Sequence, residues 1–489
     1  MMISTIVIPI ALIIVIILIM SDRVDRLVAS LSGAIITTIS LLIDSIPFST
    51  IIGFIVGTAE NNFVNFHSII LILGMLIIIT ICQEVGVFSL IAFKIVQMTG
   101  GNRYILFLML SFIAFLFSAI LNNILTVLLL IPLTITICKI LNVNPIPYII
   151  TEALVVNLGG ILFVISSIPN ILISQSIGWS FDSFFLDVGI YSFILLSITI
   201  IFLSGVNKNN LDIPSEKLVM VLKEYDPWYF VRSKKAFFRT FSMLIITIIL
   251  FITLPIYLSI DIDLIAISSG LLLIIIEKQE IKSLIKKIDF ELILYLLGIF
   301  LMTDALEYTG LLNYISDWLI YITQGNLTIT SLTILWFSAF LSSSIDNAPI
   351  TKILIPVVDR ISLLSGFDQT SKYMVFSTLV YGANLGDNLT PMGDNILVMK
   401  IVENYGKRIQ FNQFFRFGFA STLIQLIVVT VYILMKINEY FFIFGFIILI
   451  LIVFIMLFYY YRVEIFKNFK SSLIRGYNRL IKSKKKRIK

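Results

Sequence analysis

Long apolar runs separated by short polar segments dominate this sequence. A transmembrane helix needs about 20 predominantly apolar residues, and runs of roughly that length recur along the whole chain. They lie at about 3–20, 24–43, 68–85, 148–175, 184–204, 240–259, 262–276, 290–305, 372–399, 416–437 and 440–460. The pattern predicts an all-α polytopic membrane protein with about 11 spans, so the lipid bilayer is its first expected partner. The first run is interpreted as a retained span because it lacks the basic start and the cleavage site of a signal peptide.

Two further apolar blocks, at about 104–141 and 328–360, are interrupted near their middles. The first block contains Asn122-Asn123 before Pro132, and the second contains Asp346-Asn347 before Pro356. A bend at membrane depth exposes backbone groups that lipid cannot satisfy, so it persists only against protein or a wet cavity. The blocks are therefore predicted to form two re-entrant hairpins, one from each side of the membrane.

The span after each hairpin also carries helix-breaking and polar residues in its middle. The polar positions are Asn157 and Asn170 in the first span, and Asn384, Asp387, Asn388, Thr390 and Asp394 in the second. Glycine and proline unwind a helix at such points. The freed carbonyls and carboxylates suit a hard cation such as Na⁺. Both spans are predicted to be broken helices.

The hairpins and broken spans recur as two similar halves. Asn122-Asn123 matches Asp346-Asn347, and Gly74 matches Gly298 at the same spacing. Since the spans before the two hairpins are predicted to cross in opposite directions, the repeats are inverted, as in secondary transporters. The predicted organisation is N-terminal spans in 1–64, a first inverted repeat in 65–205, cytoplasmic loops and connecting spans in 206–289, a second inverted repeat in 290–437, and an extra span with a basic cytoplasmic tail in 438–489.

Lysine and arginine are concentrated in a few segments, as on the cytoplasmic side of membrane proteins. These segments are 206–239, 277–289 and 461–489, whereas the loops 44–67 and 176–183 contain neither residue. We expect a multi-pass protein of the cell membrane with its N-terminus outside and its C-terminus in the cytoplasm. The same segments account for the net charge of +6, so nucleic acid is not an expected partner.

The composition excludes several other classes of protein. Hydrophobic residues make up 59% of the chain and charged residues 13%, about half of the ~25% charged residues in soluble domains. A soluble enzyme, a disordered chain, collagen and a coiled coil are therefore excluded, and we expect no enzymatic activity. The only histidine is His67, which argues against a zinc site built on histidines. No cofactor is expected apart from Na⁺ or H⁺ as the coupling ion.

The polar side chains at the hairpin tips and helix breaks define the predicted site for a small ion. An ionisable side chain at membrane depth costs about 2.5–3.5 kcal/mol and is retained where it pairs, binds a cation or relays a proton. Asp346 is the first candidate for the coupling carboxylate, unless Lys352 pairs with it. In the alternative interpretation, the tip asparagines only cap their turns. The full predicted set is Asn122, Asn123, Thr126, Asn157, Asn170, Asp346, Asn347, Thr351, Asn384, Asp387, Asn388, Thr390 and Asp394, with Na⁺ expected at Asp346, Asp387 and Asp394.

Other acids are expected at the membrane interface and not in the site. These are Glu84, Glu152, Asp304 and Glu307. Each lies near the end of a predicted span, where water is accessible.

Several segments resemble motifs of the ion transporter superfamily. Segment 344–349, Ser-Ile-Asp-Asn-Ala-Pro, resembles a hairpin of its sodium/proton antiporter and arsenite permease branches, often grouped as citrate-transporter-like domains. Segments 122–132, 382–394 and 414–418 are similar to the family's first hairpin, second broken helix and following span. The resemblance covers about 65–435. It implies a scaffold and a transport domain, an elevator-like movement and often a homodimer.

Two departures from the family pattern leave the substrate open. The Ser-Asn-Thr hairpin tips of the dicarboxylate branch are absent, and Asn122 stands where many antiporter relatives have an acid. Asp387 and Asp394 also stand where small or neutral residues are common.

The leading hypothesis is a secondary active transporter of a small ion that works by alternating access and is coupled to Na⁺ or H⁺. Within this class, Na⁺/H⁺ antiport is favoured over efflux of arsenite or another oxyanion, and citrate or dicarboxylate symport comes third. A passive ion channel is the alternative outside the class, and the inverted repeat argues against it. An intramembrane protease with Asp346 and Asp387 as its dyad does not fit the asparagine and proline around Asp346.

Overall fold

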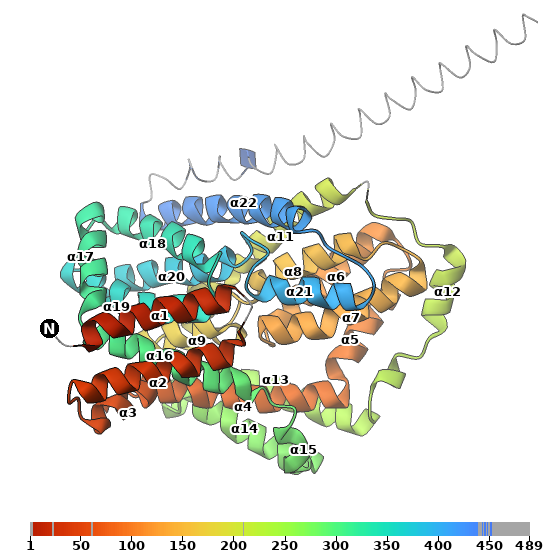
Figure 1. Cartoon of the computed structure of the whole chain (residues 1–489). Coiled ribbons are helices and arrows are strands. Elements are labelled where there is room, and N and C mark those ends of the chain that lie inside the picture. Colours follow the sequence, from red (N-terminus) through yellow and green to blue (C-terminus); the bar gives the residue numbers. More distant parts are fainter. Residues whose placement is uncertain are drawn as a thin grey trace, which may run out of the picture.

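The computed structural model describes residues 3–21, 24–59, 62–208 and 210–438, with a few single positions between 443 and 451. Across the described residues the secondary structure is helical, with no strands (Figure 1). The predicted all-α class is confirmed, in keeping with the need of each lipid-exposed segment to satisfy its own backbone groups. The structure does not describe most of the predicted last span, the basic tail or the side chain of Asp394.

The helices follow the predicted apolar runs closely. In the first part of the chain they are α1 (Ser4–Met20), α2 (Arg26–Ile43), α3 (Phe48–Val56), α4 (Val64–Val85), α5 (Val87–Met98), α6 (Arg103–Ser118), α7 (Asn123–Leu141), α8 (Ile146–Gly159), α9 (Ile168–Ile177), α10 (Phe181–Asp187) and α11 (Ser192–Asn207). In the second part they are α12 (Glu216–Glu224), α13 (Lys234–Leu258), α14 (Ile262–Glu277), α15 (Ile281–Ile285), α16 (Phe290–Tyr308), α17 (Leu311–Thr323), α18 (Leu327–Ser342), α19 (Asn347–Leu364), α20 (Gln369–Gly386), α21 (Asp394–Asn404) and α22 (Phe411–Ile437). Short 3₁₀ turns join some of them, namely η2 (Val164–Ser166), η3 (Gly189–Tyr191) and η4 (Pro227–Phe230).

Six segments among the described residues are long and apolar enough to cross a membrane. They are Arg26–Ile43, Val64–Val85, Asn123–Leu141, Phe181–Asn207, Lys234–Leu258 and Phe411–Ile437. Helix α13 leaves one apolar face uncovered, formed by Ile245, Ile249, Ile252 and Ile256. Such a face at helical spacing suits contact with lipid. Several other predicted spans coincide with shorter or broken helices, so the total of about 11 stays a prediction.

Both predicted hairpin interruptions are present as breaks between helices. Helix α6 ends at Ser118 and α7 begins at Asn123, while α18 ends at Ser342 and α19 begins at Asn347. At the first break, Oδ1 of Asn122 accepts a hydrogen bond from the backbone N–H of Leu125 at 2.8 Å. At the second, Oδ1 of Asp346 accepts one from Ala348 at 3.2 Å. Each tip side chain therefore starts the next helix by capping it.

Both broken spans end their first helix at a glycine that lies against a neighbouring helix. A Cβ atom on Gly159 would lie 2.2 Å from the backbone oxygen of Phe115, and one on Gly386 would lie 2.2 Å from that of Ala339. Only glycine allows α8 to pack this closely on α6, and α20 on α18. The helices then stop, and the chain resumes as α9 and α21.

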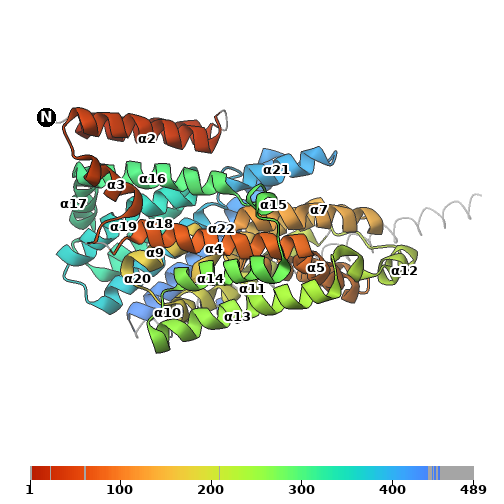
Figure 2. The ribbon, with the colours of Figure 1, turned by 90° about the horizontal axis from the view of Figure 1, so that it is seen from below.

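The segments that follow the breaks pack crosswise between the two halves. Helix α7 contacts α21, and α9 contacts α19. Around them, α1 and α2 pack on α16, whereas α13 and α14 pack on α4, and Figure 2 shows α2 and α13 on opposite faces. Protein therefore covers the polar breaks, as buried irregular backbone requires. These contacts do not test the direction in which each half crosses a membrane, so the inverted repeat and the domain boundaries stay predictions.

Two segments differ from the sequence prediction. Segment 44–67, expected as an outer loop, contains the short helix α3. The stretch between 305 and 328, for which no span was predicted, contains α17. Helix α17 buries Leu312 and Leu319 and exposes Tyr314 and Trp318. A search for long apolar runs overlooks such a narrow buried stripe.

Candidate functional site

Asparagine side chains connect the first hairpin to both broken helices. Nδ2 of Asn123 donates a hydrogen bond to Oδ1 of Asn157 at 2.5 Å. Nδ2 of Asn157 lies 3.0 Å from Oδ2 of Asp387 and 2.8 Å from Oδ1 of Asn388, and it donates to both. All four side chains are buried. The polar groups of the breaks therefore satisfy one another away from lipid.

A second set of amides ties the two broken helices together. Nδ2 of Asn384 donates to Oδ1 of Asn170 at 3.0 Å, and Nδ2 of Asn170 donates to the backbone oxygen of Gly160 at 2.7 Å. Nδ2 of Asn388 donates to the backbone oxygen of Leu154 at 2.8 Å. Since Asn384 and Asn388 come from the second half and the other residues from the first, the amide network spans both halves.

Three oxygen atoms converge on the space beside Gly160. A Cβ atom at this position would lie 2.9 Å from Oδ1 of Asn123, 3.3 Å from the backbone oxygen of Asn157 and 3.5 Å from Oδ1 of Asn384. The last oxygen is buried and accepts no hydrogen bond from the described residues. Converging amide and carbonyl oxygens are ligands that hard cations prefer. A side chain on Gly160 would meet all three oxygens, and Oδ1 of Asn123 also accepts a hydrogen bond from the Ser118 hydroxyl at 2.9 Å.

Asp387 occupies the corresponding position in the second half. The local sequences are Asn157-Leu-Gly-Gly160 and Asn384-Leu-Gly-Asp387. Asp387 follows the last residue of α20 and is 3% exposed. The C-terminal end of a helix carries partial negative charge, so it disfavours a buried anion unless positive charge compensates. Asp387 therefore places a carboxylate in the network that joins the two halves.

Asp346 faces a different environment. A cavity of about 460 Å³ is lined by Asp346 and Gly393 together with Arg26 of α2 and Lys400 of α21. The hydroxyl of Tyr295 donates to Oδ2 of Asp346 at 3.2 Å. Asp346 also caps the N-terminal end of α19, which carries partial positive charge. The two carboxylates thus sit at opposite kinds of helix end.

The cavity and the buried amide network lie close together. The Cβ position on Gly393 is 2.7 Å from Oδ1 of Asp387, and Gly393 lines the cavity. A smaller cavity of about 30 Å³ is lined by Asn122, Asn123 and Asn347. Residues of both hairpin tips therefore share one wall, next to the second helix break.

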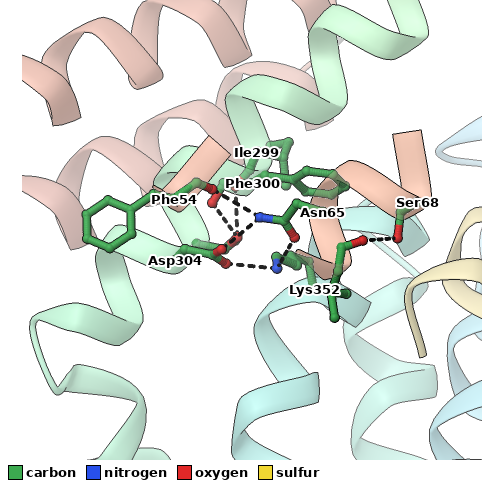
Figure 3. A network of polar contacts seen from close by, with 9 residues as sticks. Phe54, Asn65, Ser68, Ile299, Phe300, Asp304 and Lys352 are labelled. Carbon is green, nitrogen blue, oxygen red and sulfur yellow. Dashed lines mark hydrogen bonds and ion pairs between the residues drawn. The ribbon is translucent and has the colours of Figure 1, made fainter. Parts of the chain in front are cut away.

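Lys352 does not pair with Asp346. Its Nζ atom lies 2.8 Å from Oδ1 of Asp304 and 2.7 Å from Oδ1 of Asn65 (Figure 3). Nδ2 of Asn65 donates to Oδ2 of the same aspartate at 2.8 Å, and the Phe300 ring lies 5.2 Å from the ammonium. The network joins α19 to α16 and α4, because side-chain direction along α19 separates Lys352 from the hairpin tip.

The remaining predicted residues are distributed around the breaks. Oγ1 of Thr126 donates to the backbone oxygen of Asn122 at 3.0 Å, and Thr390 donates to that of Ser343. Thr351 is buried in α19, and its hydroxyl has no hydrogen-bond partner among the described residues. Asp394 begins α21, but the structure does not describe its side chain. The expected grouping of Asp346, Asp387 and Asp394 around one Na⁺ thus stays a prediction.

Two functional candidates escaped the sequence analysis. Glu152 was expected at the interface, but it is 2% exposed and accepts a hydrogen bond from Oγ1 of Thr134 at 2.6 Å. Arg26 was not singled out in the sequence, but it lines both cavities beside Asp346. Neither had a local signal, since each location depends on packing between distant helices. Glu84 pairs with Lys287 at 2.6 Å, and its place at the membrane interface stays a prediction.

Comparison with known proteins supports the predicted resemblance. The sequence model of the citrate transporter family, CitMHS, matches residues 16–378. This chain belongs to that family. The match contains both hairpins and the first broken helix, so the resemblance to the ion transporter superfamily is confirmed.

Similar proteins are found in mycobacteria and in mammals, and one of the three described below is named a transporter. The chain is 28% identical to a "46 kDa membrane protein" of Mycobacterium leprae over 423 residues, which cover 86% of this chain and 96% of that protein. It is 26% identical to an uncharacterized transporter of Mycobacterium tuberculosis over 424 residues, with the same coverage of 86% and 96%. It is 24% identical to the human P protein over 451 residues, which cover 76% of this chain and 54% of that protein.

The YdaH transporter of Alcanivorax borkumensis has a similar solved structure. The TM-score is 0.50 at 13% sequence identity, covering 79% of this chain and 86% of that chain. At this identity the likeness concerns the fold alone. The family match supports a multi-pass membrane transporter, and the structural likeness agrees with the helical fold.

Proposed function

We propose that this CitMHS family member is a secondary active transporter that moves a small ion by alternating access and is coupled to Na⁺ or H⁺. The observation that carries the proposal is the buried network in which Asn157 of one half meets Asp387 and Asn388 of the other. An ion bound there contacts both halves. A relative movement of the halves then changes which side of the membrane the ion can reach, which is the requirement of alternating access.

Asp387 is the carboxylate that we assign to coupling, ahead of Asp346. It is buried at the C-terminal end of α20 and accepts a hydrogen bond from Asn157 of the other half, so an ion bound at this carboxylate would contact both halves. Asp346 instead caps the N-terminal end of α19 and accepts a hydrogen bond from the Tyr295 hydroxyl. Asp394 stays in the proposed set through its place at the start of α21.

The oxygen atoms around Gly160 support Na⁺ as a coupling ion. The amide oxygens of Asn123 and Asn384 and the carbonyl of Asn157 surround this point. Such neutral oxygen ligands suit a hard cation but offer no site for a proton at neutral pH. Coupling to H⁺ instead rests on the buried carboxylates Asp387 and Glu152.

A small anion as cargo is supported by the two helices that begin beside the cavity at Asp346. Arg26 and Lys400 line this cavity together with Asp25 and Asp346, and α7 and α19 begin at its two hairpin tips, where helix ends carry partial positive charge. A carboxylate or an oxyanion that enters with the coupling cation fits these groups and the name of the matching family. Na⁺/H⁺ antiport is the second candidate, and it is supported by Asp346 and Asp387 on the two sides of Gly393.

Transport by purified protein in liposomes tests the proposal. Labelled Na⁺, citrate, succinate and arsenite are offered in turn under an imposed Na⁺ or pH gradient. We expect one of them to accumulate against its own gradient. The Asp387→Asn variant should lose gradient-driven accumulation by on the order of tenfold or more.

The matched control is Asp317→Asn, since Asp317 forms an exposed pair with Arg360 at 3.0 Å. This variant should accumulate cargo like the wild type. The coupling assignment is contradicted if transport does not depend on either gradient. It is also contradicted if the Asp387→Asn variant accumulates the labelled substrate as strongly as the wild type. Single-channel currents without counter-ion flux would show a passive channel instead.

A further inference from the structure

A histidine and two aspartates gather where α4 meets α14. His67 lies in the first turn of α4, Asp261 directly precedes α14, and Asp263 lies in its first turn. One donor atom from each residue lies within 4.8 Å of the other two. Nδ1 of His67 is 2.9 Å from Oδ2 of Asp263. None of the three lines the cavities beside Asp346.

The cluster combines a buried carboxylate with accessible partners. Asp263 is 1% exposed, and its Oδ1 atom accepts no hydrogen bond from the described residues. The His67 side chain is 30% exposed, and Asp261 is exposed. Leaving a buried carboxylate oxygen without a partner costs free energy. A cation that enters from the exposed side would supply the missing interaction.

We propose that His67, Asp261 and Asp263 bind a divalent transition-metal ion, with Zn²⁺ as the best-fitting member of the class. Imidazole nitrogen and carboxylate oxygen are both ligands that Zn²⁺ accepts, and water would take the remaining position of a three-residue site. Mg²⁺ and Ca²⁺ prefer oxygen ligands alone, so they fit less well. Asp261 also lines a cavity of about 210 Å³ with Ser174 and Gln175, which offers a route for the ion and its water.

The surrounding packing holds this site in place before the metal arrives. A Cβ atom on Gly74 would lie 2.5 Å from the backbone carbon of Ala266, so α4 and α14 are in very close contact. A rigid pair of helices loses little freedom when a metal joins their ends. Binding should therefore stabilise the folded protein. In the predicted topology both helix ends face outward, where the metal would be taken up.

Thermal unfolding of the purified full-length protein tests the site independently of transport. We expect Zn²⁺ to raise the melting temperature of the wild type, and the same concentration of Mg²⁺ to have little effect. His67→Gln retains a hydrogen-bond donor toward Asp263 but removes the imidazole ligand. It should weaken the apparent Zn²⁺ affinity by on the order of tenfold or more, as should Asp261→Asn.

Two control measurements distinguish the loss of the metal site from a failure to fold. Both variants should match the wild type in melting temperature without metal, which shows that they fold, and Asp317→Asn should retain the full response to Zn²⁺. No response of the wild type to Zn²⁺, or an equal response of His67→Gln and Asp261→Asn, would overturn the site.

Discussion

In both broken spans of this transporter the first helix ends at a glycine, but the residue that follows the glycine differs. In the first half, Gly160 follows α8 and leaves space between amide and carbonyl oxygens. In the second half, Asp387 follows α20 at the corresponding position and is buried. A neutral set of oxygens and a charged carboxylate therefore lie in one connected network.

The same asymmetry continues through the hairpins. Asn122 caps the first hairpin helix and Asp346 the second. Further along, Leu128 in α7 corresponds to Lys352 in α19, and only the lysine forms a buried ion pair. One monovalent cation and one carboxylate make a neutral complex, which is less costly to bury than a pair of carboxylates with one cation. We infer that the second half supplies the charge and the first half mainly supplies neutral ligands.

The largest expected effect comes from removing the buried charge of Lys352. Lys352→Met leaves Asp304 without its cationic partner, and both side chains of the pair are mostly buried at 12% and 13% exposure. Breaking such a pair costs about 3–5 kcal/mol of unfolding free energy. Equilibrium unfolding in mixed micelles measures the loss.

The double variant Lys352→Met with Asp304→Leu should recover much of this stability, because no lone charge then remains. Leu128→Met at the corresponding place in the first half should change stability by less than about 0.5 kcal/mol, since Leu128 is half exposed. If Lys352→Met has the same unfolding free energy as the wild type, the difference in charge between the hairpins does not contribute to stability.

An intermediate effect is expected from filling the space at the first break. Gly160→Ala places a methyl group 2.9 Å from Oδ1 of Asn123, and overpacking of this kind costs about 1–3 kcal/mol. Stabilisation of the protein by Na⁺ should fall at the same time. Thermal unfolding over a series of Na⁺ concentrations measures both changes. Gly53→Ala is the control, because its new methyl group meets only the side-chain methyl of Thr58. If Na⁺ stabilises Gly160→Ala as much as the wild type, the first break does not contribute to the cation site.

The smallest effect on stability is expected from making the two hairpin tips alike. Asparagine caps a helix about as well as aspartate, so Asp346→Asn should change stability by less than about 0.5 kcal/mol. Transport should respond more strongly, because the cavity loses a negative charge. With an anionic cargo the apparent affinity should rise severalfold, whereas Na⁺/H⁺ antiport should weaken. Measuring KM in liposomes distinguishes these outcomes, and an unchanged KM would separate Asp346 from the cargo site.

The helix breaks were predictable because their causes are local. Asn122 and Asp346 cap the following helix with their own side chains, and glycines end α8 and α20. Partners across the fold were not predictable from local pattern. Lys352 had Asp346 nearby in sequence, yet it pairs with Asp304, and the single histidine gave no sign of the two aspartates beside it.

The sequence by itself determined that this protein is helical and membrane-embedded, and where its helices stop. Those properties follow from apolar run length, glycine, proline and capping, which act within a few residues. Only the tertiary structure decided which carboxylate is buried at a negative helix end, which one faces a cavity with Arg26, and which ligands meet across α4 and α14. The physical reason is that charge and coordination depend on distances between helices, and packing alone sets those distances.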